Sequence, residues 1–240
     1  MAEHISLLAG KVPLVTCPPW PNPSSSSAWL AACVPAKNEE TVLDAGCGGG
    51  AVGLCLLQRM THTHVTFVDV VPQLVATTQT NIAANNRTEQ ARAQQGDILN
   101  LPFATAFNHT VANPPFYNRQ RQPGSPHAAV EQAHGADENT LTHWLNALLS
   151  HTQKGGTCTL LTHASQQDEL LRLKAAPPAH CTLIHLQTHP TKAVKQFVLQ
   201  IQAGTPAAWE ERVLPCYAAE INKAVLRDGS AAHSFITNFS

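Results

Sequence analysis

The feature that most constrains this chain is a glycine-rich turn between an apolar, strand-like run and a helix-like run. The turn reads Asp44-Ala-Gly-Cys-Gly-Gly-Gly50, so that Gly46, Gly48 and Gly50 alternate along it. Glycine adopts positive φ without steric cost and lets the backbone approach a ligand closely. A strand that leads through such a turn into a helix is typical of nucleotide-binding α/β folds. We therefore expect a ligand site at this turn.

Acidic residues stand where such a fold needs them for a nucleoside. Asp69 ends the next expected strand, nineteen residues after Gly50, and its carboxylate can accept hydrogen bonds from both ribose hydroxyls. Asp97 follows the third expected strand, where a carboxylate can accept from an adenine amino group. Cys47 is expected to contribute its backbone rather than its thiol. The predicted cofactor-binding residues are Asp44, Gly46, Cys47, Gly48, Gly50, Asp69, Val70, Asp97, Ile98 and Asn113.

Strand-like and helix-like segments alternate from residue 41 onward. The expected strands are 41–45, 64–69, 92–95, 107–112, 157–162, 181–187 and 194–202, and the expected helices are 50–60, 72–85, 137–150 and 165–173. This alternation predicts an α/β fold with a doubly wound, mainly parallel, seven-stranded sheet of the Rossmann-like type. A short turn at His189-Pro190 joins the last two strands, which we expect to form an antiparallel hairpin closing the sheet's edge.

The 240 residues fit one large α/β domain with short extensions. An N-terminal entry segment occupies residues 1–40; it is rich in proline and serine over 13–35, and the end of that stretch is expected to form one or two helical turns. The catalytic domain is expected over 41–203. Residues 204–240 form a tail that packs on or extends the domain, with a helix near 218–227.

The composition narrows the function classes further. Hydrophobic residues make up 43% of the chain, enough for a sizeable core, and the net charge is −1. Near-neutral charge argues against tight, non-specific nucleic-acid binding but leaves room for a local basic patch. The seven cysteines form no CxxC pair and the histidines have no metal-ligand spacing, so we expect no metal site. With no secretory signal and no membrane-length apolar run, the natural compartment is the cytoplasm.

A second motif, Asn113-Pro114-Pro-Phe116, follows the fourth expected strand. Ligands bind at the carboxyl ends of strands in open α/β sheets. An exocyclic or amide nitrogen is a weak nucleophile because its lone pair is delocalised. The Asn113 side chain and a backbone carbonyl held by the prolines can accept its two N–H bonds and stabilise the charge that develops on it. Phe116 can stack on a planar substrate. Asn113, Pro114 and Phe116 are therefore the predicted catalytic residues.

The form of the glycine turn indicates the cofactor. Nicotinamide sites usually read G-x-G-x-x-G, whereas this turn reads Asp-x-Gly-x-Gly-x-Gly. Asp44 on the ligand side suits the cationic amino group of S-adenosylmethionine better than a pyrophosphate. The chain resembles the class I methyltransferases in this respect, although the turn by itself also allows hydride transfer with a dinucleotide.

With both motifs, the chain resembles the bacterial tRNA adenine-N6 methyltransferases that act on valine tRNA, over about residues 10–203. The resemblance implies methyl transfer from S-adenosylmethionine to the N6 amino group of adenine in tRNA. The chain departs from the family between Cys17 and Ser27. In the relatives this stretch carries Gln-Pro, Gly, Arg and Asp and covers the cofactor. Glutamine-N5 protein methyltransferases and ribosomal RNA guanine-N2 methyltransferases share the Asn-Pro-Pro signature and remain alternatives, as does a cofactor-binding protein without catalysis.

An irregular stretch after Phe116 is expected to contact the substrate. Long loops within a compact domain are usually functional, and arginines suit a nucleic-acid backbone around an extruded base. The predicted substrate-binding residues are Phe116, Tyr117, Arg119, Arg121, Lys192 and Lys195. The expected partner is tRNA or another nucleic acid, with no membrane involved.

Overall fold

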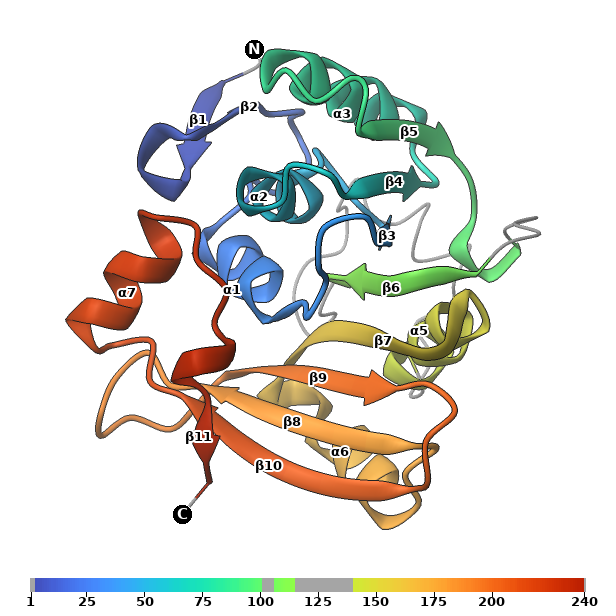
Figure 1. Cartoon of the computed structure of the whole chain (residues 1–240), viewed down its shortest axis with the longest axis vertical. Coiled ribbons are helices and arrows are strands. Elements are labelled where there is room, and N and C mark those ends of the chain that lie inside the picture. Colours follow the sequence, from blue (N-terminus) through green and yellow to red (C-terminus); the bar gives the residue numbers. More distant parts are fainter. Residues whose placement is uncertain (1–2, 101–105, 115–139, 240) are drawn as a thin grey trace.

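A mixed sheet of nine strands runs through the part of the chain that the computed structural model describes, residues 3–100, 106–114 and 140–239 (Figure 1). In spatial order its strands are β11 (Thr237–Asn238), β10 (Ala208–Leu214), β8 (His180–Leu186), β9 (Gln196–Gln202), β7 (Thr152–His163), β6 (Phe107–Ala112), β3 (Thr41–Ala45), β4 (His64–Asp69) and β5 (Ala91–Gln95). The pairs on both sides of β3 are parallel, whereas β9 is antiparallel to both β7 and β8. The strands therefore form a mainly parallel α/β sheet, as predicted.

The sheet is larger than the sequence predicted, and its edge is different. The seven expected strands are present, and β8 and β9 form the expected antiparallel hairpin. That hairpin does not close the sheet, because β10 pairs parallel with β8 outside it and β11 pairs with β10. The tail thus contributes two further strands. The sequence did not predict β10, because the adjacent charges of Glu210 and Glu211 break the apolar pattern of a buried strand. In the structure these carboxylates form ion pairs with neighbouring side chains, Glu211 with Lys174 and Glu210 with Arg212.

Helices cover both faces of the sheet (Figure 1). One apolar core joins the sheet to α1 (Ser25–Cys33), α2 (Ala51–Arg59), α3 (Pro72–Ala84) and α7 (Ala219–Leu226). The other core joins the opposite face to α5 (Thr140–Ser150) and α6 (Gln167–Ala175). The start of the helix expected at residue 137 lies outside the described residues. The architecture is therefore a three-layered sandwich, the arrangement that βαβ units produce.

A small hairpin of β1 (His4–Leu7) and β2 (Val12–Val15) precedes this sandwich. Val12 and Leu14 are buried in the core that α2 and α3 share. The helix α1 that follows is capped by Ser24, whose hydroxyl accepts the N–H of Ser26. The expected one or two helical turns are thus a nine-residue helix, and the entry segment packs against the sandwich at both ends.

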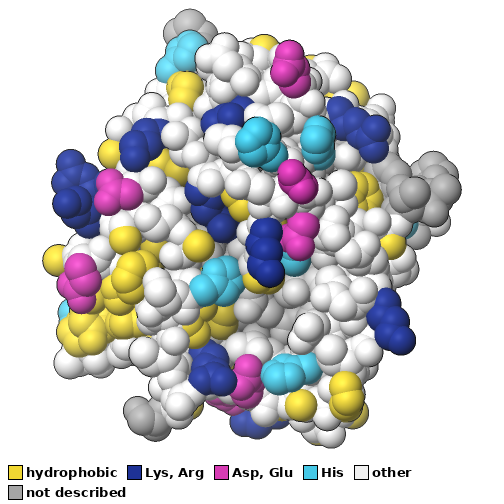
Figure 2. Space-filling view, in the orientation of Figure 1, with side chains coloured by type: hydrophobic (Ala, Val, Ile, Leu, Met, Phe, Trp, Pro, Cys, Tyr) yellow, Lys and Arg dark blue, Asp and Glu magenta, His cyan; other side chains and the backbone are white. Residues whose placement is uncertain are grey.

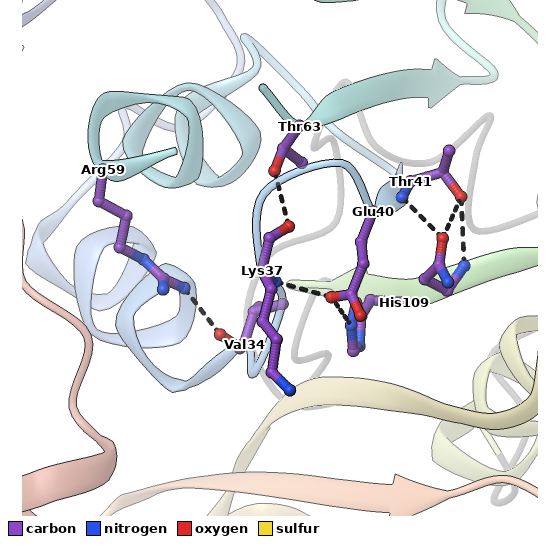
Figure 3. Close-up of polar contacts among 8 residues, drawn as sticks. Val34, Lys37, Glu40, Thr41, Arg59, Thr63 and His109 are labelled. Atoms are coloured by element: carbon purple, nitrogen blue, oxygen red, sulfur yellow. Dashed lines mark hydrogen bonds and ion pairs between the residues drawn. The ribbon is translucent and has the colours of Figure 1, made fainter. Parts of the chain in front are cut away.

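Side-chain contacts align the amino ends of β3 and β6 (Figure 3). Asn108 Oδ1 accepts the backbone N–H of Thr41 at 2.8 Å and its hydroxyl at 2.9 Å. The Glu40 carboxylate lies 2.9 Å from Nε2 of the buried His109 and accepts the Lys37 N–H at 2.7 Å. These contacts hold β3 and β6 in one register, so that their other ends, at Ala45 and Ala112, also pair. The register is what brings the two sequence motifs together.

The helix α1 is held at its carboxyl end by Arg59 (Figure 3). The guanidinium donates to the carbonyl oxygens of Ala31 and Val34 at 2.8 and 2.7 Å. Terminal helix carbonyls lack partners within their own helix, and a cation there also interacts favourably with the helix dipole. The contact attaches the entry segment to α2, which begins at the glycine turn.

The surface shown in Figure 2 carries Lys, Arg, His and acidic side chains interspersed rather than in a field of one sign. This agrees with the net charge of −1. None of the helices among the described residues is both long and apolar enough to cross a membrane.

Candidate active site

The two sequence motifs lie next to each other at the carboxyl edge of the sheet. Ala45, the last residue of β3, pairs with Ala112, the last residue of β6. The glycine turn starts directly after Ala45, and Asn113 directly after Ala112. Asp69 ends β4 on the other side of β3 and pairs with Gln95, the end of β5. The sheet thus gathers the predicted residues at the edge where open α/β sheets bind ligands.

The turn adopts the conformation that its glycines predict. Gly46, Gly48 and Gly50 have φ of 62°, 56° and 82°, a region that other residues enter only at a cost. The N–H of Gly50 donates to the Cys47 carbonyl at 2.8 Å and closes the turn before α2. A Cβ on Gly48 would meet no atom of the described residues within 4 Å, whereas one on Gly46 would lie 2.7 Å from the Trp144 ring. Gly46 therefore packs against Trp144, and Gly48 borders space that the described residues leave open.

Asp69 is bound to the turn through both carboxylate oxygens. Oδ2 accepts the N–H of Gly48 and Oδ1 accepts the N–H of Val71, both at 2.9 Å. The side chain is 7% exposed, and burial raises its pKa against the lowering effect of these N–H groups. A carboxylate has about four acceptor positions, so that each oxygen keeps capacity for a ribose hydroxyl.

Asp44 faces the start of α2 rather than open solvent. Its Oδ2 accepts the N–H of Gly53 at 2.9 Å, and the residue is 1% exposed. Burial, with a smaller contribution from the charge of Asp69, raises the pKa of Asp44 to about 7. The carboxylate therefore fixes the first turn of α2 and places a titratable group beneath the glycine turn. Its predicted role toward an amino group stays a prediction.

The third acidic residue lies at the next strand end. Asp97 is half-buried, and its Oδ2 accepts the Asn100 side-chain N–H at 2.8 Å. Ile98 beside it is 5% exposed. The N–H of Gly96 donates to the Asp69 carbonyl at 3.0 Å, which ties this segment to the end of β4. Half-buried Val70 lies between the two strand ends and its carbonyl accepts from the Gln95 side chain.

The structure describes part of the predicted catalytic motif, Asn113 and Pro114. Asn113 is half-buried and Pro114 is buried, directly beyond the paired end of β6. The other predicted residues of the motif and the following loop, Phe116, Tyr117, Arg119 and Arg121, lie outside the described residues. The structure therefore places Asn113, which the sequence predicts to bind the substrate nitrogen, next to the turn that carries Gly46.

Lys192 and Lys195 lie on the connection between β8 and β9, and both are exposed. This connection is at the same edge as Asn113, because β8 is parallel to β7 through the shared partner β9. The Lys195 carbonyl accepts the N–H of Ala164, the residue after β7, at 2.9 Å. The two ammonium groups thus stand on the edge that carries the glycine turn.

Cys47 has its thiol turned inward, against the hydroxyl of Thr78 at 3.7 Å. Burial, with the charges of Asp44 and Asp69, raises the pKa of this thiol well above its ordinary value. A protonated, buried thiol is a poor nucleophile. Among the described residues, none of the groups of His, Cys, Asp and Glu is arranged to hold a metal ion.

Sequence reasoning missed three residues that support the site. Thr78 and Asn81, on one face of α3, donate to the carbonyls of Gly48 at 2.6 Å and Gly49 at 2.8 Å. Trp144 of α5 lies against Gly46. The buried polar pair at i and i+3 in an otherwise amphipathic helix was the available signal for the first two.

Comparison of the sequence with known proteins relates the part of the chain that carries this site to one family. A model of the methyltransferase small domain matches residues 22–139, the span that contains the glycine turn, the three acidic residues and Asn113. Residues 22–139 are similar to the methyltransferase small-domain family. The chain is accordingly a methyltransferase, and the residues at its sheet edge are candidate members of a methyltransferase site.

Relatives and solved structures agree with this family. A tRNA1(Val) (adenine(37)-N6)-methyltransferase from Vibrio vulnificus is 25% identical over 195 residues, 79% of each chain. A predicted O-methyltransferase from Agrobacterium tumefaciens superposes with a TM-score of 0.66 at 15% identity, over 86% of this chain and 97% of that one. A Listeria monocytogenes protein assigned to the class I S-adenosylmethionine-dependent methyltransferases gives 0.59 at 14% identity, over 85% and 67%. The methyltransferase fold therefore extends beyond the matched domain.

Proposed function

We propose that this methyltransferase transfers a methyl group from S-adenosylmethionine to the N6 amino nitrogen of an adenine in tRNA, in the cytoplasm. The observation that carries the proposal is the pairing of Ala45 with Ala112, which sets Asn113 beside the glycine turn. A nucleoside held at the turn would then meet a planar nitrogen held by Asn113. The tRNA adenine-N6 methyltransferase named among the relatives supports the substrate.

The residues at the turn fit the proposed cofactor. The described residues leave space for a ligand at Gly48, where an added Cβ would meet none of their atoms within 4 Å. Asp69 stands beside that space with acceptor capacity for the two ribose hydroxyls. Asp97 can accept from the adenine amino group, and Asp44 supplies negative charge below the turn for the cofactor's ammonium group. The side chains around this space are thus carboxylates, which can accept hydrogen bonds from ribose hydroxyls and attract an ammonium group. A pyrophosphate would require the opposite, N–H donors and positive charge.

The chemistry at the substrate follows from Asn113. When bound, S-adenosylmethionine supplies a methyl group whose C–S electron pair stays on sulfur as the new N–C bond forms. The Asn113 side-chain oxygen accepts one N–H of the substrate amine, and the carbonyl of buried Pro114 accepts the other. These two acceptors localise the lone pair on nitrogen and stabilise its developing positive charge. The proton then leaves the nitrogen after transfer, without a dedicated base.

An RNA substrate is supported by the position of Lys192 and Lys195. Both are exposed at the edge that carries Asn113, where ammonium groups can neutralise phosphates and release counterions. The near-neutral charge of the chain makes such a contact local. The predicted contacts of Phe116, Tyr117, Arg119 and Arg121 with the same substrate belong to this proposal.

The test is methyl transfer from tritiated S-adenosylmethionine to unmodified bulk tRNA, followed by nucleoside analysis of the product. We expect label in N6-methyladenosine, and a rate of labelling about a hundredfold or more lower with the Asn113→Ala protein. Label in N2-methylguanosine, or in a protein glutamine with RNA ignored, would refute the substrate. A protein that binds the cofactor and labels neither RNA nor protein would be the cofactor-binding alternative.

A further inference from the structure

Asn81 of α3 is a buried polar residue that reaches two separate parts of the backbone. Its Oδ1 accepts the N–H of Val15 at 2.7 Å, and its Nδ2 donates to the carbonyl of the same residue at 3.1 Å. The second hydrogen of that Nδ2 is directed at the carbonyl of Gly49, 2.8 Å away. The side chain is 0% exposed, and these three contacts use both of its N–H groups and one acceptor position of its oxygen.

The two backbone segments that Asn81 joins are far apart in sequence and adjacent in space. Val15 ends β2 of the entry segment, whereas Gly49 lies within the glycine turn. A Cβ on Gly49 would lie 3.9 Å from the Val15 carbonyl oxygen and 3.5 Å from Asn81 Nδ2. The stretch from Thr16 to α1 therefore begins next to the glycine turn.

A neighbouring contact strengthens the same connection. Thr78, one helical turn before Asn81 on α3, donates its hydroxyl to the Gly48 carbonyl at 2.6 Å. Two consecutive carbonyls of the turn are thus bound by α3. The preceding peptide directs the N–H of Gly48 at Asp69. The helix therefore fixes the two peptide groups that follow Gly48 and adjoin this N–H.

We propose that Asn81 is a positioning residue for cofactor binding, which couples the entry segment to the glycine turn. By holding Val15 and Gly49 together, it sets where the stretch after Val15 lies relative to the turn, and it fixes the peptide groups beside Gly48. This proposal rests on S-adenosylmethionine binding at the turn, as argued above. Asn81 acts through the backbone and not on the reacting atoms, so its loss affects cofactor affinity and spares the chemical step.

The chain offers a matched control for a purely structural role. Asn85, one turn further along α3, donates to the Pro13 carbonyl at 2.8 Å and so binds the same strand β2. The hydrogen bonds of its side chain go to Pro13 and to the backbone of α3 at Asn81, and not to the glycine turn. A residue that merely fastens β2 to α3 would behave like Asn85, whereas a positioning residue would not.

The experiment compares Asn81→Asp with Asn85→Ala by calorimetric titration of S-adenosylmethionine and by steady-state kinetics. An Asp carboxylate keeps an acceptor for Val15 N–H and sets an oxygen against the carbonyls of Val15 and Gly49. We expect Asn81→Asp to raise the Kd for S-adenosylmethionine by about tenfold, with kcat at saturating cofactor within about twofold of the parent. Asn85→Ala should leave both quantities within about twofold.

A second variant covers the case in which Asn81→Asp does not fold. Val15→Pro removes the N–H that Asn81 accepts while α3 and the glycine turn keep their sequence, and it too should raise the Kd and spare kcat. Unchanged Kd in the folded variants, or a loss confined to kcat, would overturn the positioning role. Failure of the parent protein to bind S-adenosylmethionine would instead refute the proposed function, so the two failures are distinct.

Discussion

One carboxylate oxygen of Asp69 accepts the backbone N–H of Gly48 over 2.9 Å. This single bond joins the end of β4 to the turn that follows β3, at the edge where Asn113 also lies. It holds the peptide of a positive-φ glycine beside the space that a ligand would enter. The bond therefore links the conformation of the turn to the acid expected to bind the cofactor.

The first prediction concerns this acid. Asp69→Ala should weaken S-adenosylmethionine binding by about 1–3 kcal/mol, because the ribose hydroxyls and the Gly48 N–H lose their acceptor. Isothermal calorimetry with purified protein measures the change, and circular dichroism checks that the variant is folded. A folded variant with the parent's affinity would mean that Asp69 serves the turn alone.

The second prediction separates chemistry from cofactor binding. Asn113→Ala should lower kcat by about a hundredfold or more, since a contact to charge developing in the transition state is lost. Cofactor affinity should stay near that of the parent, because Asn113 is expected to act mainly on the substrate nitrogen. Single-turnover kinetics with tRNA measures the chemical step. Near-normal turnover would show Asn113 to be only the end of a strand.

The third prediction compares two glycines of the turn. Gly46→Ala and Gly48→Ala both place a side chain at positive φ, which costs about 1–3 kcal/mol at a non-glycine residue. Only at position 46 would the new Cβ meet Trp144, at 2.7 Å. We expect Gly46→Ala to lower the free energy of unfolding further, and Trp144→Leu to recover part of the difference. Equal losses in urea unfolding would rule out the packing argument.

The fourth prediction is a pH dependence. Burial raises the pKa of Asp44 from its ordinary 3.8 to about 7, so the folded protein binds this proton more tightly than the unfolded chain. The resulting stabilisation is complete below about pH 3.8 and is lost as the pH rises through about 7. Asp44→Asn removes this loss and keeps an oxygen for the Gly53 N–H.

The difference between variant and parent isolates Asp44 from the other titrating groups. Chemical unfolding should give similar stabilities at pH 4 and a more stable Asp44→Asn variant at pH 8. If Asp44 also faces the cofactor's ammonium group, the same variant should bind S-adenosylmethionine more weakly at pH 8. Parallel stability curves across the range would contradict the raised pKa.

The fifth prediction tests the RNA contact. Replacing Lys192 and Lys195 with alanine should raise the KM for tRNA and flatten its dependence on salt, because fewer counterions are released. Lys154→Ala is the matched control, since Lys154 is exposed near the amino end of β7, away from Asn113. Equal salt slopes for the parent and the double variant would remove these lysines from the RNA surface.

The sequence by itself determined the local features of the site. Alternating glycines specify positive φ, and apolar runs that end at Asp69 and Asn113 mark strand ends, because both signals depend only on nearby residues. Since parallel strands bring their carboxyl ends to one edge, the meeting of these residues could also be foreseen. The helix near 218–227 was predicted on the same grounds and is α7.

Only the tertiary structure decided which distant segments support that site. Asn81 reaches Val15 and Gly49, and Trp144 backs Gly46, through contacts that no periodic pattern encodes. The same holds for β10, where packing of the elements brings Lys174 to Glu211 and His180 to Glu210. A sequence pattern reports the conformation of neighbouring residues, whereas the partner of a buried amide or carboxylate is fixed by how the elements pack.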